Sequence, residues 1–333
     1  KKFGPPRKPT EALEARHKDL AASLQSLLEE AVFKILRYAH SLTGEKNLCL
    51  AGGVFLNSVA NGKILANTPF EDVYIQPAAG DSGGSVGAAF YAYNSLLKNP
   101  RSYVQTTAYL GPEYSQAEIK NFLDRGGIKY QVFSGEQELL KKTAVLIKQN
   151  AVIGWFQGRM EWGPRALGSR SILSNPAEAK MKDILNLKVK HREAFRPFAP
   201  AIALENTGEY FEAPQKIPLP ADFMLMVYPI KPEKRPLIPA VTHVDGSGRL
   251  QTVRREANPL YYDLIREVEK LTGIPVLINT SFNIRGEPIV CAPHDAYRCM
   301  MGTGIDYLVM DKFLIARADN PQDMWDSEIY AKD

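Results

Sequence analysis

Hydrophobic positions near the start of the chain follow first helical and then strand spacing. Apolar side chains recur every three or four positions over 10–43, which predicts a long helix. Short apolar runs at 47–51 and 72–76 predict strands, and each is followed by a glycine-rich turn and a further helix, over 58–67 and 83–97. The order strand, turn, helix, repeated once, is typical of an α/β fold. The apolar positions of the first helix are Leu20, Leu24, Leu27, Ala31, Ile35 and Tyr38.

The same alternation of helices and strands continues after a polar stretch at 94–107, where we place a domain boundary between residues 1–98 and 99–333. Beyond it the pattern predicts helices over 115–124, 135–149, 177–189, 257–272 and 293–301, and strands over 129–133, 151–156, 199–204, 223–228, 240–244, 249–253, 275–280 and 306–316. Leu260, Leu264, Val268 and Leu271 share one face of the 257–272 helix, which predicts packing on a sheet. Prolines over 212–239 predict a long surface excursion.

Composition excludes several classes of protein but does not indicate a particular reaction. The chain has 333 residues and a formal net charge of +4, which weakly favours anionic ligands over a nucleic-acid coat. Its three cysteines form no CxxC pair, so neither a disulfide framework nor a structural zinc site is expected. We expect a cytoplasmic protein with no membrane span. Because residue 1 is Lys, we also expect a C-terminal fragment of something longer.

Two glycine-rich turns follow the first two strands. Gly52, Gly53 and Asn57 lie in one turn, and Asp81, Gly83 and Gly84 lie in the other. Glycine lets main-chain N–H groups approach a phosphate, and a helix that starts there adds a favourable dipole. The alternative is that these glycines serve only tight packing; the two turns together with Asp81, a candidate metal ligand, favour a nucleotide-phosphate site. The spacing fits neither a P-loop nor a dinucleotide-binding fingerprint.

Guanidinium groups are concentrated in the second half of the chain. Residues 158–171 (GRMEWGPRALGSRS) hold Arg165 and Arg170, and Arg196 lies between Phe195 and Phe198. Arginine forks match phosphate or carboxylate, and several near one point are best tolerated around an anion. Strand spacing puts Ser281 and Asn283 on the same face of their segment. Lys190 and Arg192 would likewise share a face if their own segment is extended. The remaining cation of the set is Arg249.

Other chemistry has less support in the sequence. His243 and Asp245 could share a strand face and bind a metal, but such a pair is more often a hydrogen-bonded structural pair. Neither a Ser-His-Asp arrangement nor a nucleophilic cysteine context is visible, so covalent catalysis is not indicated. Positioning and charge stabilisation remain, which suits phosphoryl or adenylyl transfer.

Six motifs, in order, resemble those of the O-carbamoyltransferases of antibiotic tailoring and nodulation-factor synthesis: LAGGVFLNSVANGKI, PAAGDSGGSVGAA, GRMEWGPRALGSRSIL, FRPFAPAI, HVDGSGRLQTV and INTSFNIRGEPIV. The resemblance implies the second lobe of an actin-like, sugar-kinase-like domain followed by a YrdC-type twisted-sheet domain. It also implies that the second domain makes carbamoyl-adenylate from carbamoyl phosphate and ATP with its Mg²⁺, and that the first transfers the carbamoyl group to a hydroxyl of a small molecule.

Carried over residue by residue, the resemblance assigns a role to each candidate. Catalytic roles fall on Arg165, Lys190, Arg196, Arg249, Ser281 and Asn283. Nucleotide-binding roles fall on Gly52, Gly53, Asn57, Gly83, Gly84, Arg170 and Arg192. Asp81 would bind Fe²⁺ or a similar metal, with its other ligands, an HxxxH-type pair, on an earlier lobe that this chain lacks. Either the chain is a C-terminal fragment, or a separate chain supplies that lobe.

The resemblance leaves alternatives open. The first is a carbamoyl-adenylate synthase that serves RNA modification, and others are an RNA-binding module and a remnant that binds nucleotide without catalysis. Few aromatic residues interleave with the basic ones on a strand, so a nucleic-acid partner is not expected. The acceptor and the oligomeric state, which could be a homo-oligomer, are not readable.

Overall fold

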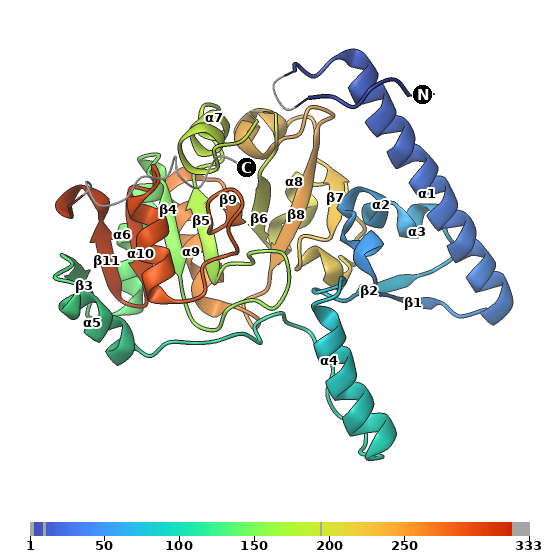
Figure 1. Cartoon of the computed structure of the whole chain (residues 1–333), viewed down its shortest axis with the longest axis horizontal. Coiled ribbons are helices and arrows are strands. Elements are labelled where there is room, and N and C mark those ends of the chain that lie inside the picture. Colours follow the sequence, from blue (N-terminus) through green and yellow to red (C-terminus); the bar gives the residue numbers. More distant parts are fainter. Residues whose placement is uncertain (1–2, 9–10, 194, 322–333) are drawn as a thin grey trace.

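The N-terminal part of the chain is a small α/β unit built on two strands. The computed structural model describes residues 3–8, 11–193 and 195–321. Its first elements are α1 (Ala15–Thr43), β1 (Asn47–Leu50), α2 (Ser58–Gly62), α3 (Ile64–Asn67), β2 (Asp72–Ile75) and α4 (Gly83–Phe90), which continues as a wider π-type turn over Tyr91–Leu96 (Figure 1). Strands β1 and β2 pair in parallel. The expected order of strands, turns and helices is confirmed, with the 58–67 helix interrupted at Lys63.

The C-terminal part is a large mixed sheet with helices on both faces. Its helices are α5 (Gln116–Arg125), α6 (Glu136–Lys148), α7 (Met181–Ile184), α8 (Thr207–Tyr210), α9 (Pro259–Thr272) and α10 (Pro293–Met301). Its strands are β3 (Gln131–Val132), β4 (Ile153–Phe156), β5 (Arg170–Ser174), β6 (Ala199–Ala203), β7 (Met226–Pro229), β8 (Ser247–Val253), β9 (Val276–Ser281), β10 (Tyr307–Met310) and β11 (Phe313–Ala316). Among the described residues these strands form one sheet in the order β3-β11-β10-β4-β5-β9-β6-β8-β7.

Alternating side chains of this sheet feed two hydrophobic layers. Leu277 faces the layer that α6 and α9 cover, whereas its neighbour Ile278 faces the layer that holds α10. Leu264 and Val268 are buried against the sheet, as the sequence predicts for the 257–272 helix, while Leu271 is 37% exposed. The second layer also takes in Ile64 and Ile75 of the N-terminal unit. The two parts of the chain therefore share a hydrophobic core.

The N-terminal unit sits against the edge strand of the large sheet. Gly62 of α2 lies so close to β7 that a β-carbon there would come within 2.1 Å of the Val227 carbonyl oxygen. Next to it, Asn61 Nδ2 donates to the Leu225 carbonyl at 3.0 Å. Covering an edge strand in this way protects its main chain from pairing with other chains.

Several expected elements differ in the structure. Strand β5 was not predicted, because it lies in the segment interpreted as a loop. Residues 240–244 form no strand: a short 3-10 turn (Pro239–Val241) is followed by a second turn, in which the Gly246 N–H donates to the His243 carbonyl at 2.9 Å. The single strand expected over 306–316 is a hairpin, because Asp311 adopts φ +47° between β10 and β11. The surface excursion expected over 212–239 is wrong in its centre, because residues 220–226 are buried.

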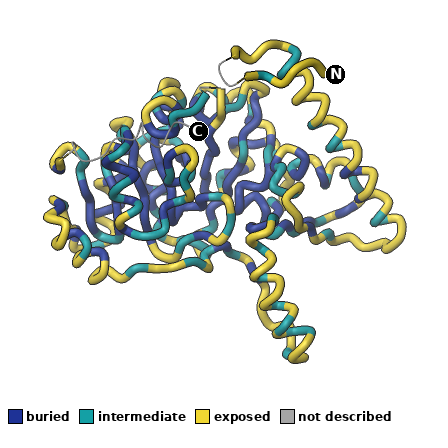
Figure 2. The backbone as a smooth tube through the Cα atoms, viewed as in Figure 1, coloured by how far each residue is buried: buried dark blue, intermediate teal, exposed yellow. Residues whose placement is uncertain are grey.

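The apolar face of the first helix points outward. The side chains of Leu24, Leu27, Ile35 and Tyr38 are 63–69% exposed, whereas Val32, Phe33 and Leu36 make the contact with the unit's core. Figure 2 shows the long α1 and the projecting α4 as mostly exposed. Within the described part of the chain, the helices lack the combined length and apolar character that a membrane crossing requires.

Candidate functional site

Lys190 lies at the centre of the strongest candidate site. Its Nζ donates to Asn283 Oδ1 at 2.8 Å, to the Asn283 carbonyl at 3.0 Å and to Ser281 Oγ at 3.2 Å, and it also contacts the Ser281 carbonyl. Ser281 Oγ donates to Asn283 Oδ1 at 2.7 Å, so the hydroxyl and the amide do share a face, as the spacing predicts. Lys190 is 4% exposed, and burial lowers the pKa of its ammonium group to about 7.

Three guanidinium groups lie close enough to one another, or to Lys190, for their charges to interact. The pKa of Arg249 falls to about 9 because of burial and the nearby charges of Arg165 and Arg192. The pKa of Arg192 falls to about 10 through burial, and the charge of Arg192 in turn lowers that of Lys190. The Nε atoms of Arg165 and Arg249 are buried without a hydrogen-bond partner. We call Arg165, Lys190, Arg192 and Arg249 the cationic cluster; an anion among them would relieve both the repulsion and the unmet hydrogen bonds.

Arg196 lies at the outer side of the cluster. Its charge contributes to the lowered pKa of Arg192, but its side chain is 47% exposed and its Nε pairs with Glu193 at 2.9 Å. Arg192 donates from Nε to Asn186 Oδ1 at 2.7 Å and stacks over the Phe198 ring at 4.9 Å. The expectation that Lys190 and Arg192 share a face of an extended segment is wrong. Residues Leu185–Val189 form a π-type helix and His191 has φ +44°, so the two side chains diverge.

Arg170 occupies a different environment from the cationic cluster. It is fully buried on β5, and its NH1 donates to the carbonyls of Gln157 at 3.0 Å, Gly158 at 3.1 Å and Ser169 at 2.9 Å. Its guanidinium carbon lies 3.6 Å from the centre of the Phe156 ring. These contacts favour a structural role, and the nucleotide-binding role expected for Arg170 stays a prediction without support from its geometry.

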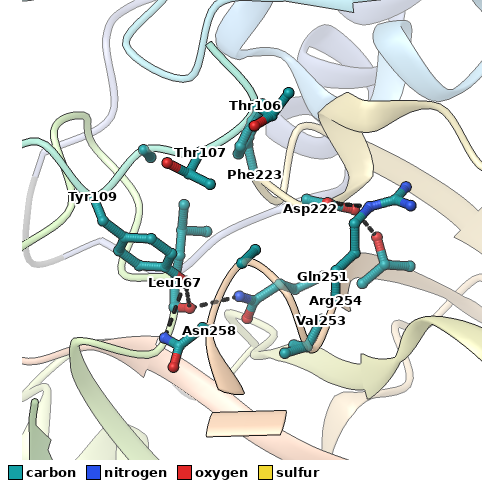
Figure 3. A pocket seen from close by; sticks show the side chains of 13 residues that line it. Thr106, Thr107, Tyr109, Leu167, Asp222, Phe223, Gln251, Val253, Arg254 and Asn258 are labelled. Atoms are coloured by element: carbon teal, nitrogen blue, oxygen red, sulfur yellow. Dashed lines mark hydrogen bonds and ion pairs between the residues drawn. The ribbon is translucent and has the colours of Figure 1, made fainter. Parts of the chain in front are cut away.

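The loop that carries Arg165 is held by buried polar side chains. We call residues 161–170 the bracing loop. Glu161 Oε1 accepts hydrogen bonds from the main-chain N–H groups of Leu167 at 2.7 Å and Ser169 at 2.6 Å. Tyr109 Oη and Gln251 Nε2 both donate to the Leu167 carbonyl, at 2.9 and 2.8 Å. Figure 3 shows these two side chains converging on Leu167, beside a cavity of about 20 Å³.

Further bonds complete this support. Asn279 Nδ2 of β9 donates to the Ala166 carbonyl at 3.2 Å, and Trp155 Nε1 of β4 donates to the Gly168 carbonyl at 3.0 Å. Gly168 has φ +107°, and a β-carbon there would come within 2.3 Å of the Tyr261 ring. Sequence reasoning missed Glu161, Gln251 and Asn279, since nothing local marks them: they come from segments far apart in the chain.

The two glycine turns line a second hollow. It has a volume of about 610 Å³ and is bordered by Gly52, Gly80, Asp81, Gly83 and Gly84, among others. We call it the glycine pocket. The main-chain N–H of Gly52 donates to the Ala79 carbonyl at 2.6 Å, which joins the two turns.

The glycines of these turns are not equivalent. Added β-carbons at Gly52, Gly53 or Gly84 would meet nothing within 4 Å, so these positions are open to a ligand, although Gly52 at φ +110° also needs glycine for its backbone. At Gly83 a β-carbon would come within 2.1 Å of the Ala78 carbonyl oxygen, which explains that glycine by packing. Asn57 caps α2, accepting from Ala60 N at 3.1 Å, and donates to Gln25 Oε1 at 2.8 Å.

The role of Asp81 as one ligand of a metal, with the other ligands on an earlier lobe, stays a prediction. Asp81 is exposed at the glycine pocket, and within the described ranges no group of three His, Cys, Asp or Glu side chains is placed to hold a metal ion. One carboxylate does not fit a protein-bound iron by itself, so we derive no step through a metal. His243 and Asp245 are likewise structural, because Ser247 Oγ lies 3.1 Å from His243 Nδ1 and donates to Asp245 Oδ1 at 2.7 Å.

The chain is similar in sequence to nodulation proteins of two rhizobia and to an uncharacterized cyanobacterial protein. The chain is 45% identical to nodulation protein NolNO of Sinorhizobium fredii over 92% of the chain and 45% of that protein, and 40% identical to nodulation protein NolO of Bradyrhizobium diazoefficiens over 91% and 55%. It is also 45% identical to an uncharacterized protein of a Synechocystis strain, over 96% and 56%. The chain thus spans about half the length of these curated relatives.

A crystal structure of full-length HypF in its phosphate- and nucleotide-bound form is a distant structural neighbour, with a TM-score of 0.39 and 15% identity over 57% of this chain and 23% of that chain. A likeness at that level carries no argument about ligands. Family models are more decisive: one described as carbamoyltransferase N-terminus matches residues 2–90, and one described as carbamoyltransferase C-terminus matches residues 144–317, more than half of the chain. The chain belongs to the carbamoyltransferase family.

Proposed function

We propose that the large-sheet part of this chain makes carbamoyl-adenylate from carbamoyl phosphate and ATP at the cationic cluster. The observation that carries the proposal is the pair of buried, unpartnered guanidinium Nε atoms of Arg165 and Arg249. The charge of Arg192 acts on both Arg249 and the buried ammonium of Lys190, which links that ammonium to the pair. Both substrates are polyanions, and holding them in contact costs several kcal/mol of repulsion unless cations lie between them. The cluster supplies those cations in a site where burial already strengthens their attraction for anions.

The proposed reaction has two bond-breaking steps. Water cleaves carbamoyl phosphate to carbamate and phosphate; a carbamate oxygen then attacks the α-phosphorus of ATP, and the α–β phosphoanhydride bond breaks to release pyrophosphate. Lys190, fixed by Ser281 and Asn283, would neutralise the carbamate and the developing charge on the α-phosphate. Arg165, Arg192 and Arg249 would hold the phosphate groups, with Arg196 at the outer side.

The second proposed step is transfer at the glycine pocket. There a hydroxyl oxygen of a small-molecule acceptor attacks the carbamoyl carbon, and AMP leaves. Gly52, Gly53 and Gly84 offer open main chain for the nucleotide. We assign the two parts of the chain to the second lobe of an actin-like, sugar-kinase-like domain and to a YrdC-type domain on the motifs alone.

We also propose that a preceding lobe completes the N-terminal unit. Strand β1 pairs only with β2 within the described residues, and parallel sheets normally have more strands and both faces covered. The exposed apolar face of α1, with Leu24, Leu27 and Ile35, needs a similar cover. The relatives are about twice the length of this chain, which leaves room for such a lobe.

Product analysis tests the proposal. The chain is incubated with ATP and carbamoyl phosphate, and phosphate, pyrophosphate and adenylate are quantified by chromatography. We expect phosphate and pyrophosphate in equal amounts, dependent on carbamoyl phosphate. An Arg249→Met variant should lose pyrophosphate release. Release that needs threonine and bicarbonate in place of carbamoyl phosphate would favour the RNA-modifying alternative, and release of neither product would refute carbamoyl-adenylate formation.

A further inference from the structure

Trp162 makes a contact between the two candidate sites that neither the motifs nor the family assignment explains. It lies in the bracing loop, whose buried residues 166–168 are bonded to the large sheet. Its indole instead contacts the N-terminal unit: Nε1 donates to the Ser82 carbonyl at 3.0 Å, next to Asp81 in the second glycine turn. The indole is 38% exposed, so it does not serve mainly as a core residue.

Two neighbours of Trp162 make parallel contacts with the N-terminal unit. Arg165 NH2 donates to the Leu56 carbonyl at 3.3 Å, at the end of the first glycine turn. Gly163 at φ +144° lies so close to the chain before the second turn that a β-carbon there would be 3.0 Å from the Pro77 carbonyl oxygen. The bracing loop therefore reaches both glycine turns from its exposed side.

The opposite side of the loop is fixed to the large sheet by Trp155 and Asn279, which donate to the Gly168 and Ala166 carbonyls. Within the loop, Glu161 is 4% exposed, and its Oε1 accepts from the Leu167 and Ser169 N–H groups. The main-chain N–H of Trp162 donates to the Ala108 carbonyl at 2.7 Å, in the segment that precedes α5. Trp162 and Arg165 therefore belong to one braced segment and contact the two glycine turns through separate hydrogen bonds.

We propose that Trp162 is a positioning residue that sets the Asp81 turn according to what the cationic cluster binds. This inference rests on the proposed function, because it takes the cluster to be the anion site. The second turn is held locally by two main-chain bonds, Gly83 N to the Gly80 carbonyl at 3.0 Å and Gly84 N to the Asp81 carbonyl at 2.9 Å. The Trp162 N–H, which donates to the Ser82 carbonyl between these two bonds, restrains the turn further. Through the bracing loop, a change in the position of Arg165 on anion binding reaches the turn.

Hydrogen exchange measured by mass spectrometry tests the inference on the 333-residue chain, with pyrophosphate as the probe. Trp162→Phe keeps an aromatic ring at this position and removes the N–H donor. We expect peptides that cover 79–87 to exchange about fivefold faster in this variant, as loss of one typical hydrogen bond predicts. In the wild type, saturating pyrophosphate should slow exchange in the same peptides. In Trp162→Phe that protection should be lost, while the affinity for pyrophosphate stays within about twofold.

Controls separate the possible outcomes. Arg159→Gln, just outside the bracing loop and bonded to Gly111 and Glu113 instead, should behave as wild type. Peptides of α9 report whether the fold is intact, and Trp162→Leu repeats the comparison should the Phe variant not fold. Equal basal exchange in wild type and variant, or equal protection by pyrophosphate, would overturn the inference. Failure of pyrophosphate to bind the wild type would refute the anion site instead, and the basal comparison would still decide whether Trp162 restrains the turn.

Discussion

Replacing Lys190 by Met separates the role of its charge from that of every other titratable group. Met has a similar length and no charge, so it removes the ammonium that contacts Ser281 and Asn283 without opening a large cavity. A hydrogen bond to a charged group contributes about 2 kcal/mol, so the affinity for ATP or pyrophosphate should fall about 30-fold at pH 6.5.

The pH dependence gives the sharper comparison. Lys190 has a pKa of about 7 in the folded protein, and a bound anion would raise it. Binding then takes up a proton above pH 7, and the affinity of the wild type should fall roughly 20-fold between pH 6.5 and 8.5 relative to the variant. Isothermal titration calorimetry of both proteins at both pH values, in buffers of different ionisation enthalpy, measures the affinity and the proton uptake.

The comparison with the variant removes other contributions. Lys190→Met retains all remaining ionisable groups and sees the same titration of the ligand, so only the difference between the proteins reports on Lys190. The lowered pKa of Lys190 also sets the direction in which stability changes with pH. The folded pKa lies below the ordinary value of 10.5, so the unfolded chain binds more protons between pH 7 and 10.5. The free energy of unfolding should therefore rise more steeply with pH there in the wild type than in Lys190→Met. Parallel pH profiles for the two proteins would refute this account.

Three further predictions concern stability. Arg249→Met should raise the free energy of unfolding of the unliganded protein by about 1 kcal/mol, because a buried charge with unmet Nε is removed, and should abolish the rise in Tm that pyrophosphate causes; a lower Tm without ligand would contradict it. Gly62→Ala should cost about 2 kcal/mol through its clash with the Val227 carbonyl, measured by urea denaturation, whereas Gly208→Ala, which has open space, should be neutral. Glu161→Ala should cost about 3 kcal/mol, because it leaves two buried N–H groups unpaired, and a loss below 1 kcal/mol would show that the bracing loop is not held by this carboxylate.

The sequence predicts the local order of elements well and the long-range support of the site poorly. Glycine turns after short apolar runs carry a local signal, and the spacing of Ser281 and Asn283 fixes their shared face. Strand β5 has no such signal: it is buried on both sides yet begins with Arg170, whose charge is satisfied by carbonyls from other segments. Those partners are brought together only by the folded sheet.

The site itself shows the same division. That Lys190 bonds both Ser281 and Asn283 could not be read from spacing, because it depends on the π-type turn at Leu185–Val189 and on the left-handed backbone of His191. The first helix shows the converse: its apolar stripe predicts the helix, yet the stripe faces outward, since the residues that reach the core are Val32, Phe33 and Leu36. The spacing of apolar residues predicts that a helix forms, but it does not show which part of the chain packs against each face of that helix.

A crystal structure of the chain with pyrophosphate bound tests the central claim most directly. We predict density for the anion between the guanidinium groups of Arg165 and Arg249, with an oxygen within hydrogen-bond distance of each Nε and of Lys190 Nζ. An anion bound elsewhere under the same conditions, with both Nε atoms still unpartnered, would contradict the assignment of the cationic cluster as the site of adenylate formation.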